Sequence, residues 1–136
     1  MIDFQDRLAD LLDERITALN LDIPLFNDNN GTDESLALYS LPGGTVIRAY
    51  MDETKEKQLN YEIQGKSKDR DRIFNIISAI SDILENVENV ESANDSYDFQ
   101  DISVSSEPYF NESETDGYLY FRTTFQVKLT IYKGEK

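Results

Sequence analysis

The sequence predicts an α+β fold, in which a mostly antiparallel mixed sheet of four to five strands carries two helices packed on one face. Two observations predict it. Amphipathic helical segments lie at the start and in the middle of the 136-residue chain, and segments with alternating apolar and polar residues lie between and after them. Because an apolar helix face needs a covering layer, this order favours a single two-layer domain over residues 1–136.

The predicted helices cover residues 2–19 and 68–87. Their apolar residues recur mainly at three- and four-residue spacings, which places them on one face of each helix. Asp3 or Asp6 is expected to cap the first helix, and Ser67 or Asp69 the second. The apolar positions are Ile2, Phe4, Leu8, Leu11, Leu12, Ile16 and Leu19 in the first helix and Ile73, Ile76, Ile77, Ile80, Ile83, Leu84 and Val87 in the second.

The strands follow from alternation and from turn residues. In the last predicted strand, apolar side chains at the odd positions face one side and polar ones the other. Pro42-Gly43-Gly44 predicts a tight turn or a flexible break, and the charged segment 52–57 predicts a hairpin loop. The predicted strands are 45–51, 58–64, 97–106 and 117–132, with a further short strand at 36–40.

Composition excludes several classes of protein. The chain has 27 acidic and 13 basic residues, a net charge of −14, and neither histidine nor cysteine nor tryptophan. Disulfide scaffolds, Ser-His-Asp and Cys-His catalysis, and zinc sites made of Cys and His are therefore impossible. The charge argues against broad contact with nucleic-acid phosphates or with anionic membranes.

The acidic residues are unevenly placed. Between Asp82 and Asp116 there are eleven acidic residues and no basic one. Three interpretations remain open. The segment forms a solvated surface, it holds calcium or magnesium, or it forms an acidic wall past which nucleic acid moves without adhering.

Two motifs fail when their spacing is checked. Gln64-Gly65-Lys66-Ser67 precedes a helix like a phosphate-binding loop, but Asn60 stands where that loop needs its first glycine, so a helix-capping turn is favoured. Phe26–Ala37 has a glycine at the sixth position of a calcium loop, but neither its first nor its last residue can ligate. Paired carboxylates for hydrolysis stay open, but we expect no enzyme, cofactor or metal site.

Aromatic residues of the last third are the candidate interface. Tyr118, Tyr120 and Tyr132 share the polar face of the last predicted strand, and Tyr109 and Phe110 precede it. Tyrosine is enriched in protein interfaces. The alternative is that a second helix or a loop covers the three tyrosines.

The chain also resembles a known family. The resemblance rests on an acidic amphipathic start, the strand Leu59–Gln64, the segment GKSKDRDRIFNIISAISDILE and the segment DFQDISVSSEPYFNESETDGYLYFRTTFQVKLTIY. In this order they resemble the small tail-terminator proteins of long-tailed bacteriophages, from about Ile2 to Lys133. Members from phages of Gram-positive hosts are often labelled minor capsid proteins, and related proteins join the tail to the head.

The resemblance implies a virion structural protein without catalytic residues. It implies a mixed sheet flanked by helices and a hexameric ring of copies that caps the tail tube and stops its growth. The expected partners are further copies, the tail tube protein and a head-completion protein. DNA would pass through the ring without specific binding. The expected location is the head–tail junction of the virion, after synthesis in the bacterial cytoplasm.

Two other functions are kept open. An acidic protein of this size can mimic DNA and occupy the basic groove of a host protein. A carboxylate metalloenzyme using calcium, magnesium or manganese is the third hypothesis. The acid-rich start is unlike a signal peptide, and the chain has no apolar run of the ~20 residues that span a bilayer.

Overall fold

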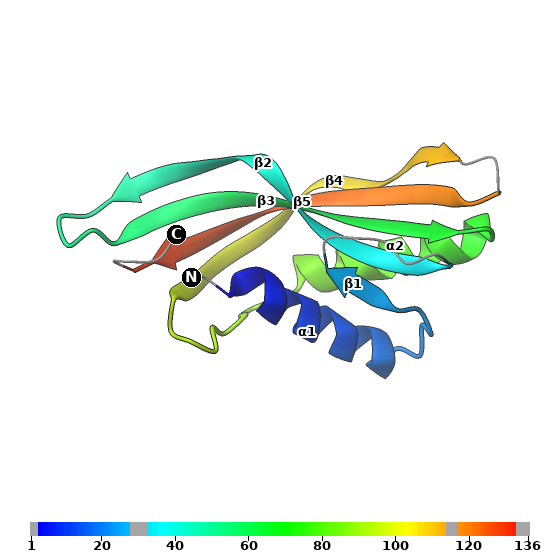
Figure 1. The fold of residues 1–136 in the computed structure, drawn as a ribbon, viewed down its shortest axis with the longest axis horizontal. Coiled ribbons are helices and arrows are strands. Elements are labelled where there is room, and N and C mark those ends of the chain that lie inside the picture. Colours follow the sequence, from blue (N-terminus) through cyan, green and yellow to red (C-terminus); the bar gives the residue numbers. More distant parts are fainter. Residues whose placement is uncertain (1–2, 28–32, 114–116, 133–136) are drawn as a thin grey trace.

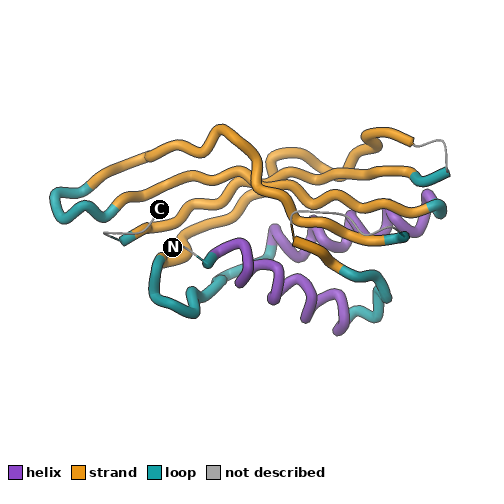
Figure 2. The backbone as a smooth tube through the Cα atoms, viewed as in Figure 1, coloured by secondary structure: helices purple, strands orange, loops and turns teal. Residues whose placement is uncertain are grey.

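Helices and sheet form two layers in the computed structural model, which describes residues 3–27, 33–113 and 117–132 (Figures 1 and 2). The sheet has five strands in the order β1-β2-β3-β5-β4, and only the β1–β2 pair is parallel. The predicted α+β class, with a mixed, mostly antiparallel sheet, is confirmed. The elements are α1 (Phe4–Ala18), β1 (Leu25–Asn27), β2 (Ser35–Ala49), β3 (Lys55–Ser67), α2 (Arg70–Glu85), β4 (Tyr97–Ser113) and β5 (Leu119–Ile131).

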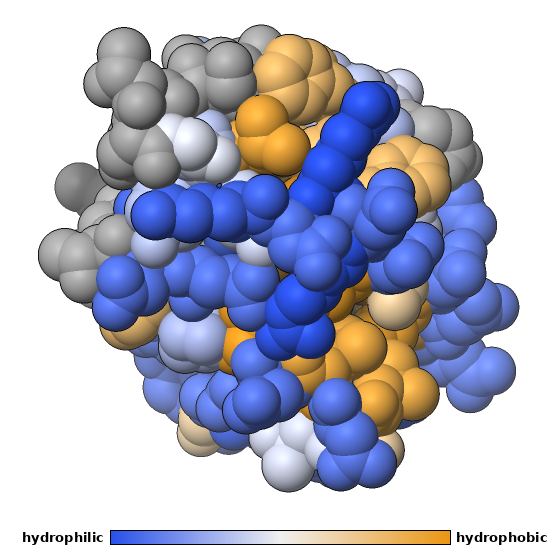
Figure 3. All heavy atoms as spheres, turned by 90° about the vertical axis from the view of Figure 1, so that its right-hand side faces the viewer, coloured by the Kyte–Doolittle hydropathy of each residue, from blue (hydrophilic) through white to orange (hydrophobic). Residues whose placement is uncertain are grey.

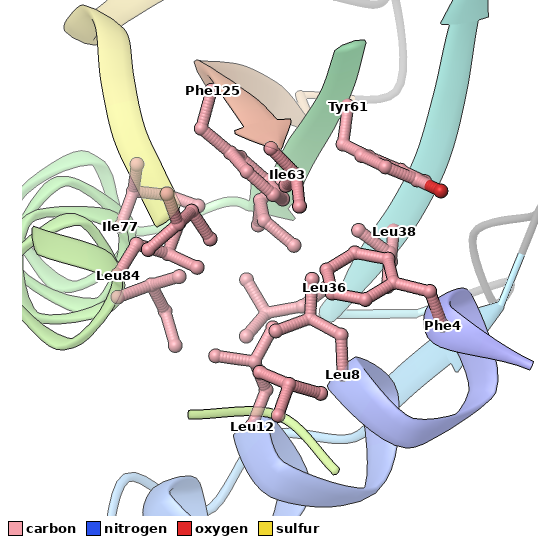
Figure 4. Packing of buried hydrophobic residues seen from close by; sticks show 14 of the residues in the cluster. Phe4, Leu8, Leu12, Leu36, Leu38, Tyr61, Ile63, Ile77, Leu84 and Phe125 are labelled. Atoms are coloured by element: carbon pink, nitrogen blue, oxygen red, sulfur yellow. The ribbon is translucent and has the colours of Figure 1, made fainter. Parts of the chain in front are cut away.

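Both helices cover the same face of the sheet, as predicted (Figure 1). The helix α1 packs against β1 and β2, and α2 packs against β3, β4 and β5. Figure 4 shows Phe4, Leu8 and Leu12 of α1 pointing toward side chains from the sheet and from α2. The predicted apolar stripes therefore form the core, although Leu19 at the end of α1 is exposed and Ile2 lies outside the described residues.

The strand β2 corrects the prediction of a turn or break at Pro42-Gly43-Gly44. Leu41 pairs with Asn60, and the next paired residue, Thr45, pairs with Gln58, so these residues form a bulge inside one continuous strand. Proline is tolerated because β2 is an edge strand here, where a missing N–H breaks no ladder bond. Gly43 has a φ of +98°, which glycine adopts without strain.

The strand β4 also runs further than the predicted 97–106. It continues past Pro108 to Ser113, with four irregularities in its pairing to β5. The same reason applies, since β4 is the other edge of the sheet and its bulges absorb the proline. The helices are slightly shorter than predicted, and β3 extends beyond 58–64 at both ends.

The prediction of a helix-capping turn at Gln64–Ser67 is wrong, because these residues pair with β5 and form the end of β3. Gly65 lies directly under α2. A Cβ atom on Gly65 would come within 2.7 Å of Ile73 Cδ1 and 2.8 Å of Ile77 Cδ1. A side chain at position 65 would push the ends of these two isoleucine side chains aside, so glycine permits the close packing of helix on sheet. Asp69 caps α2 by accepting a hydrogen bond from the backbone N–H of Arg72 at 3.2 Å, as predicted.

Asp3 precedes α1 but does not cap it. Its carboxylate instead accepts hydrogen bonds from Ser92 Oγ at 2.7 Å, from the backbone N–H of Ala93 at 2.8 Å and from Ser96 Oγ at 3.2 Å. Partial burial raises the pKa of Asp3, but these hydrogen bonds together outweigh it and lower the pKa. The start of α1 is thereby tied to the loop before β4.

Candidate protein-interaction surfaces

One end of the molecule carries an exposed cluster that we call the aromatic–basic patch, made of Arg70, Phe74 and Phe110. The rings of Phe74 and Phe110 meet the buried ring of Phe121 edge-on, with centroids 5.8 and 5.6 Å apart. Phe74 is 44% exposed and Phe110 48% exposed. Exposed aromatic rings that are held in place by a buried one are typical of protein interfaces.

One cation, Arg70, borders these rings, whereas Lys68 contacts Tyr118 instead. The guanidinium of Arg70 lies 5.9 Å from the Phe121 ring centroid, and the ammonium of Lys68 lies 5.0 Å from that of Tyr118. Arg72 is used internally, because it pairs with Glu34 at 2.8 Å and donates to two backbone carbonyls. Lys68 and Arg70 are exposed. Figure 3 views this end and shows long hydrophilic side chains beside hydrophobic surface.

The opposite end of the sheet carries a hairpin that we call the arm, residues 41–57. It is formed by the second half of β2, the turn and the start of β3, and it extends beyond the helices (Figure 1). Its exposed large apolar residues are Val46, Ile47, Tyr50 and Met51. A fully exposed methionine at the tip, together with three further apolar side chains, indicates a surface that a partner covers.

The turn of the arm is ordered and acidic. The Tyr50 backbone N–H donates to the Thr54 carbonyl at 2.8 Å, and the Thr54 N–H donates to the Asp52 carboxylate at 3.0 Å. The hydrogen bonds from Thr54 favour the ionised form of the Asp52 carboxylate and lower the pKa of Asp52. The hairpin predicted at 52–57 is present, but its turn covers residues 50–54, since β2 ends at Ala49, before the end of the predicted strand 45–51, and β3 begins at Lys55.

Both edges of the sheet are protected against simple strand addition. β1 covers β2 only at Leu36–Leu38, so the rest of β2 is an edge, and β4 is the other edge. Each edge carries a proline and bulges, and both features disrupt a regular ladder. Contacts between molecules are therefore expected to use side chains rather than backbone pairing.

The five predicted interface residues do not form one surface. Phe110 is exposed on β4 within the aromatic–basic patch, whereas Tyr109 is exposed on the opposite face of β4. Tyr118 lies 4.7 Å from the Lys66 ammonium, and Tyr120 is only 7% exposed. Tyr132 lies at the far end of β5, where its hydroxyl donates to Asp98. Tyr120 therefore offers a partner almost no surface.

Sequence reasoning missed Phe74 and the arm. Phe74 lies beside the apolar stripe of α2 and adds one more apolar residue to an already apolar helix. In the arm, Val46 and Ile47 are adjacent, so they point to opposite faces of β2, and both remain exposed. Apolar residues on both faces of one strand are the signal that was available, but buried strands show the same pattern.

The acidic segment after Asp82 is spread over three elements. Its members occupy the end of α2, the loop before β4 and β4 itself. Among the described residues, no group of three or more Asp or Glu side chains is arranged to hold a metal ion. Two segments lie outside the described residues. They are residues 28–32, which belong to the tested calcium loop, and residues 114–116, which end the acidic segment.

Comparison with known proteins assigns no family. No family model matches the chain, and no curated protein matches it. In the part of the chain described here, neither helix has the length and apolarity to cross a membrane.

Proposed function

We propose that this protein is a bacteriophage virion structural protein, a tail terminator or head-to-tail joining protein that works as a ring. The proposal starts from the resemblance of the chain to the tail-terminator family. The single structural observation that supports it is the placement of exposed apolar surfaces at two opposite ends of one sheet, the arm and the aromatic–basic patch (Figure 1). A subunit with two different apolar ends suits a head-to-tail contact that closes into a ring.

The mechanism is geometric. A ring bound to the end of the tail tube covers the surface to which the next tube subunit would add, so growth of the tube stops. The exposed side of the ring then offers a surface to the head. Such a ring needs no catalytic group, and the net charge of −14 disfavours adhesion of DNA that travels through it.

The test is a phage that lacks the gene, with tails imaged by negative-stain electron microscopy. A terminator predicts tails that exceed the normal length and vary widely. Tails of normal, defined length that stay separate from filled heads would assign the protein to head-to-tail joining instead. Normal, infectious particles would contradict both roles. Restoring the gene on a plasmid is the control.

The second candidate is an acidic DNA mimic that binds a host protein, and the net charge of −14 favours it. This function predicts a monomer at all concentrations and a host partner that DNA displaces. It leaves the apolar residues of the arm without a role, because a DNA mimic binds through its charged surface. We therefore place it second.

A further inference from the structure

The composition of the arm tip is typical of a surface that binds a partner. Tyr50 and Met51 are exposed and apolar, and they are followed directly by Asp52 and Glu53. The turn itself is held by backbone hydrogen bonds, so the tip presents a preformed surface rather than a loose loop. A complementary surface must offer apolar area next to positive charge.

The aromatic–basic patch has that composition. Phe74 and Phe110 provide exposed ring faces, and methionine sulfur makes favourable contacts with aromatic rings. Arg70 lies over the Phe121 ring between them and is exposed, which suits charge-assisted hydrogen bonds to carboxylates. In a chain with 27 acidic and 13 basic residues, an exposed arginine beside an aromatic cluster favours an acidic, apolar ligand.

The two surfaces cannot meet within one molecule. The turn of the arm lies where β2 leads into β3, whereas the patch lies where β3 ends and α2 begins, at opposite ends of the same long strand β3 (Figure 1). A contact between them must therefore join two copies, and each copy still has one free surface of each kind. This is the geometry of a heterologous interface.

We propose that the arm tip of one copy docks on the aromatic–basic patch of the next copy. Met51 packs between Phe74 and Phe110, and the acidic residues of the turn face Arg70. This inference rests on the proposed ring for its biological meaning, but it makes a separate claim about which surfaces touch. It also explains why both sheet edges are blocked, since the contact is made by side chains.

Cysteine cross-linking tests the contact directly, because the chain has no cysteine of its own. Met51→Cys and Phe74→Cys are made as separate proteins, mixed at high concentration and oxidised. Docking predicts a disulfide-linked dimer in the mixture and at least tenfold less in either protein alone. The matched control is Glu85→Cys, which is exposed at the last residue of α2, at the opposite end of that helix from Phe74. It should cross-link to neither partner above background.

The outcomes separate this inference from the proposed function. A Met51→Cys/Phe74→Cys double variant should give a ladder of oligomers that ends in a species without free thiols. A ladder of open oligomers without a closed species would support the docking contact but contradict the ring. If light scattering finds ring-sized particles but no disulfide forms between positions 51 and 74, the ring is supported and the docking contact is overturned. Cross-linking of Met51→Cys only to itself would also overturn it.

Exchanging the charges of two residues tests the docking contact in a second way, without introducing cysteine. Arg70→Glu should weaken self-association up to about fivefold, the upper end of the range for an exposed ion pair. Adding Glu53→Lys to the same chain should restore most of the loss, because the two reversed charges face each other again. Asp13→Lys, which changes an exposed acid on α1, is the matched control and should not rescue. Equal rescue by both lysines would overturn the proposed pairing.

Discussion

At the scale of single residues, Asp3 shows how one side chain serves two elements. The sequence predicts a cap for α1, but the carboxylate binds the Ser92–Ser96 segment instead. The difference has a physical reason: Ser and backbone N–H groups from a distant loop compete with the helix amides for the same carboxylate. A sequence pattern identifies a group that can accept hydrogen bonds, but tertiary contacts decide which donors it meets.

Asp3→Asn should lower the free energy of unfolding at neutral pH by about 1 kcal/mol, because solvent screens this partly exposed clamp. The folded pKa of Asp3 lies below its ordinary value of 3.8. Its contribution to stability is therefore complete above that value and disappears as the pH falls through the folded pKa. Urea unfolding at pH 7 and below pH 3 measures this difference.

Asp13→Asn is the control, since Asp13 is an exposed acid on α1. It should change stability little at either pH. A constant penalty for Asp3→Asn down to the lowest pH would contradict the clamp.

At the scale of elements, the periodic segments were the predictable part. Both helices and the facing of β5 follow from spacing alone, because Phe121, Phe125 and Leu129 alternate with polar residues and are buried. Pro42-Gly43-Gly44 was not predictable as a bulge. The same residues form turns in other chains, and the pairing of β2 with β3 on both sides decides the outcome.

The fit of α2 on β3 depends on the missing side chain of Gly65. Gly65→Ala should lower the free energy of unfolding by about 1–3 kcal/mol, because the new methyl group overlaps Ile73 and Ile77. Adding Ile73→Val removes the nearest carbon atom and should recover part of the loss. Urea denaturation of the two single variants and the double variant measures the coupling. Strictly additive effects would show that the overlap is not the cause.

The candidate surfaces were less predictable than the elements. Tyr109 and Phe110 were identified from composition and are exposed, whereas Tyr120 belongs to the same pattern and is buried. Exposure depends on which side chains from other strands lie alongside, and a single sequence does not contain that information. Phe74 and Met51 belong to the candidate surfaces only because their side chains are exposed. The spacing of residues along the sequence does not indicate exposure of this kind.

At the scale of the whole molecule, a net charge of −14 opposes association between copies. Self-association should therefore strengthen as salt rises from 10 mM to 150 mM, where the screening length falls from about 30 Å to about 8 Å. The few ion pairs at the proposed contact weaken over this range, but the general repulsion between copies weakens more. Light scattering at fixed protein concentration measures the trend. Association that decreases with salt would show that ion pairs dominate the contact.

The hairpin geometry of the arm restricts how its reach can change. Successive residues of a strand point to opposite faces, so an insertion of one residue on one side of the turn would turn every side chain beyond it around. Two residues on each strand would instead keep every side chain on its face, lengthen the arm by about 7 Å and leave the helices and the core in place. In the proposed assembly, the spacing between copies is thus adjustable only in steps of this size, and without redesign of the hydrophobic interior.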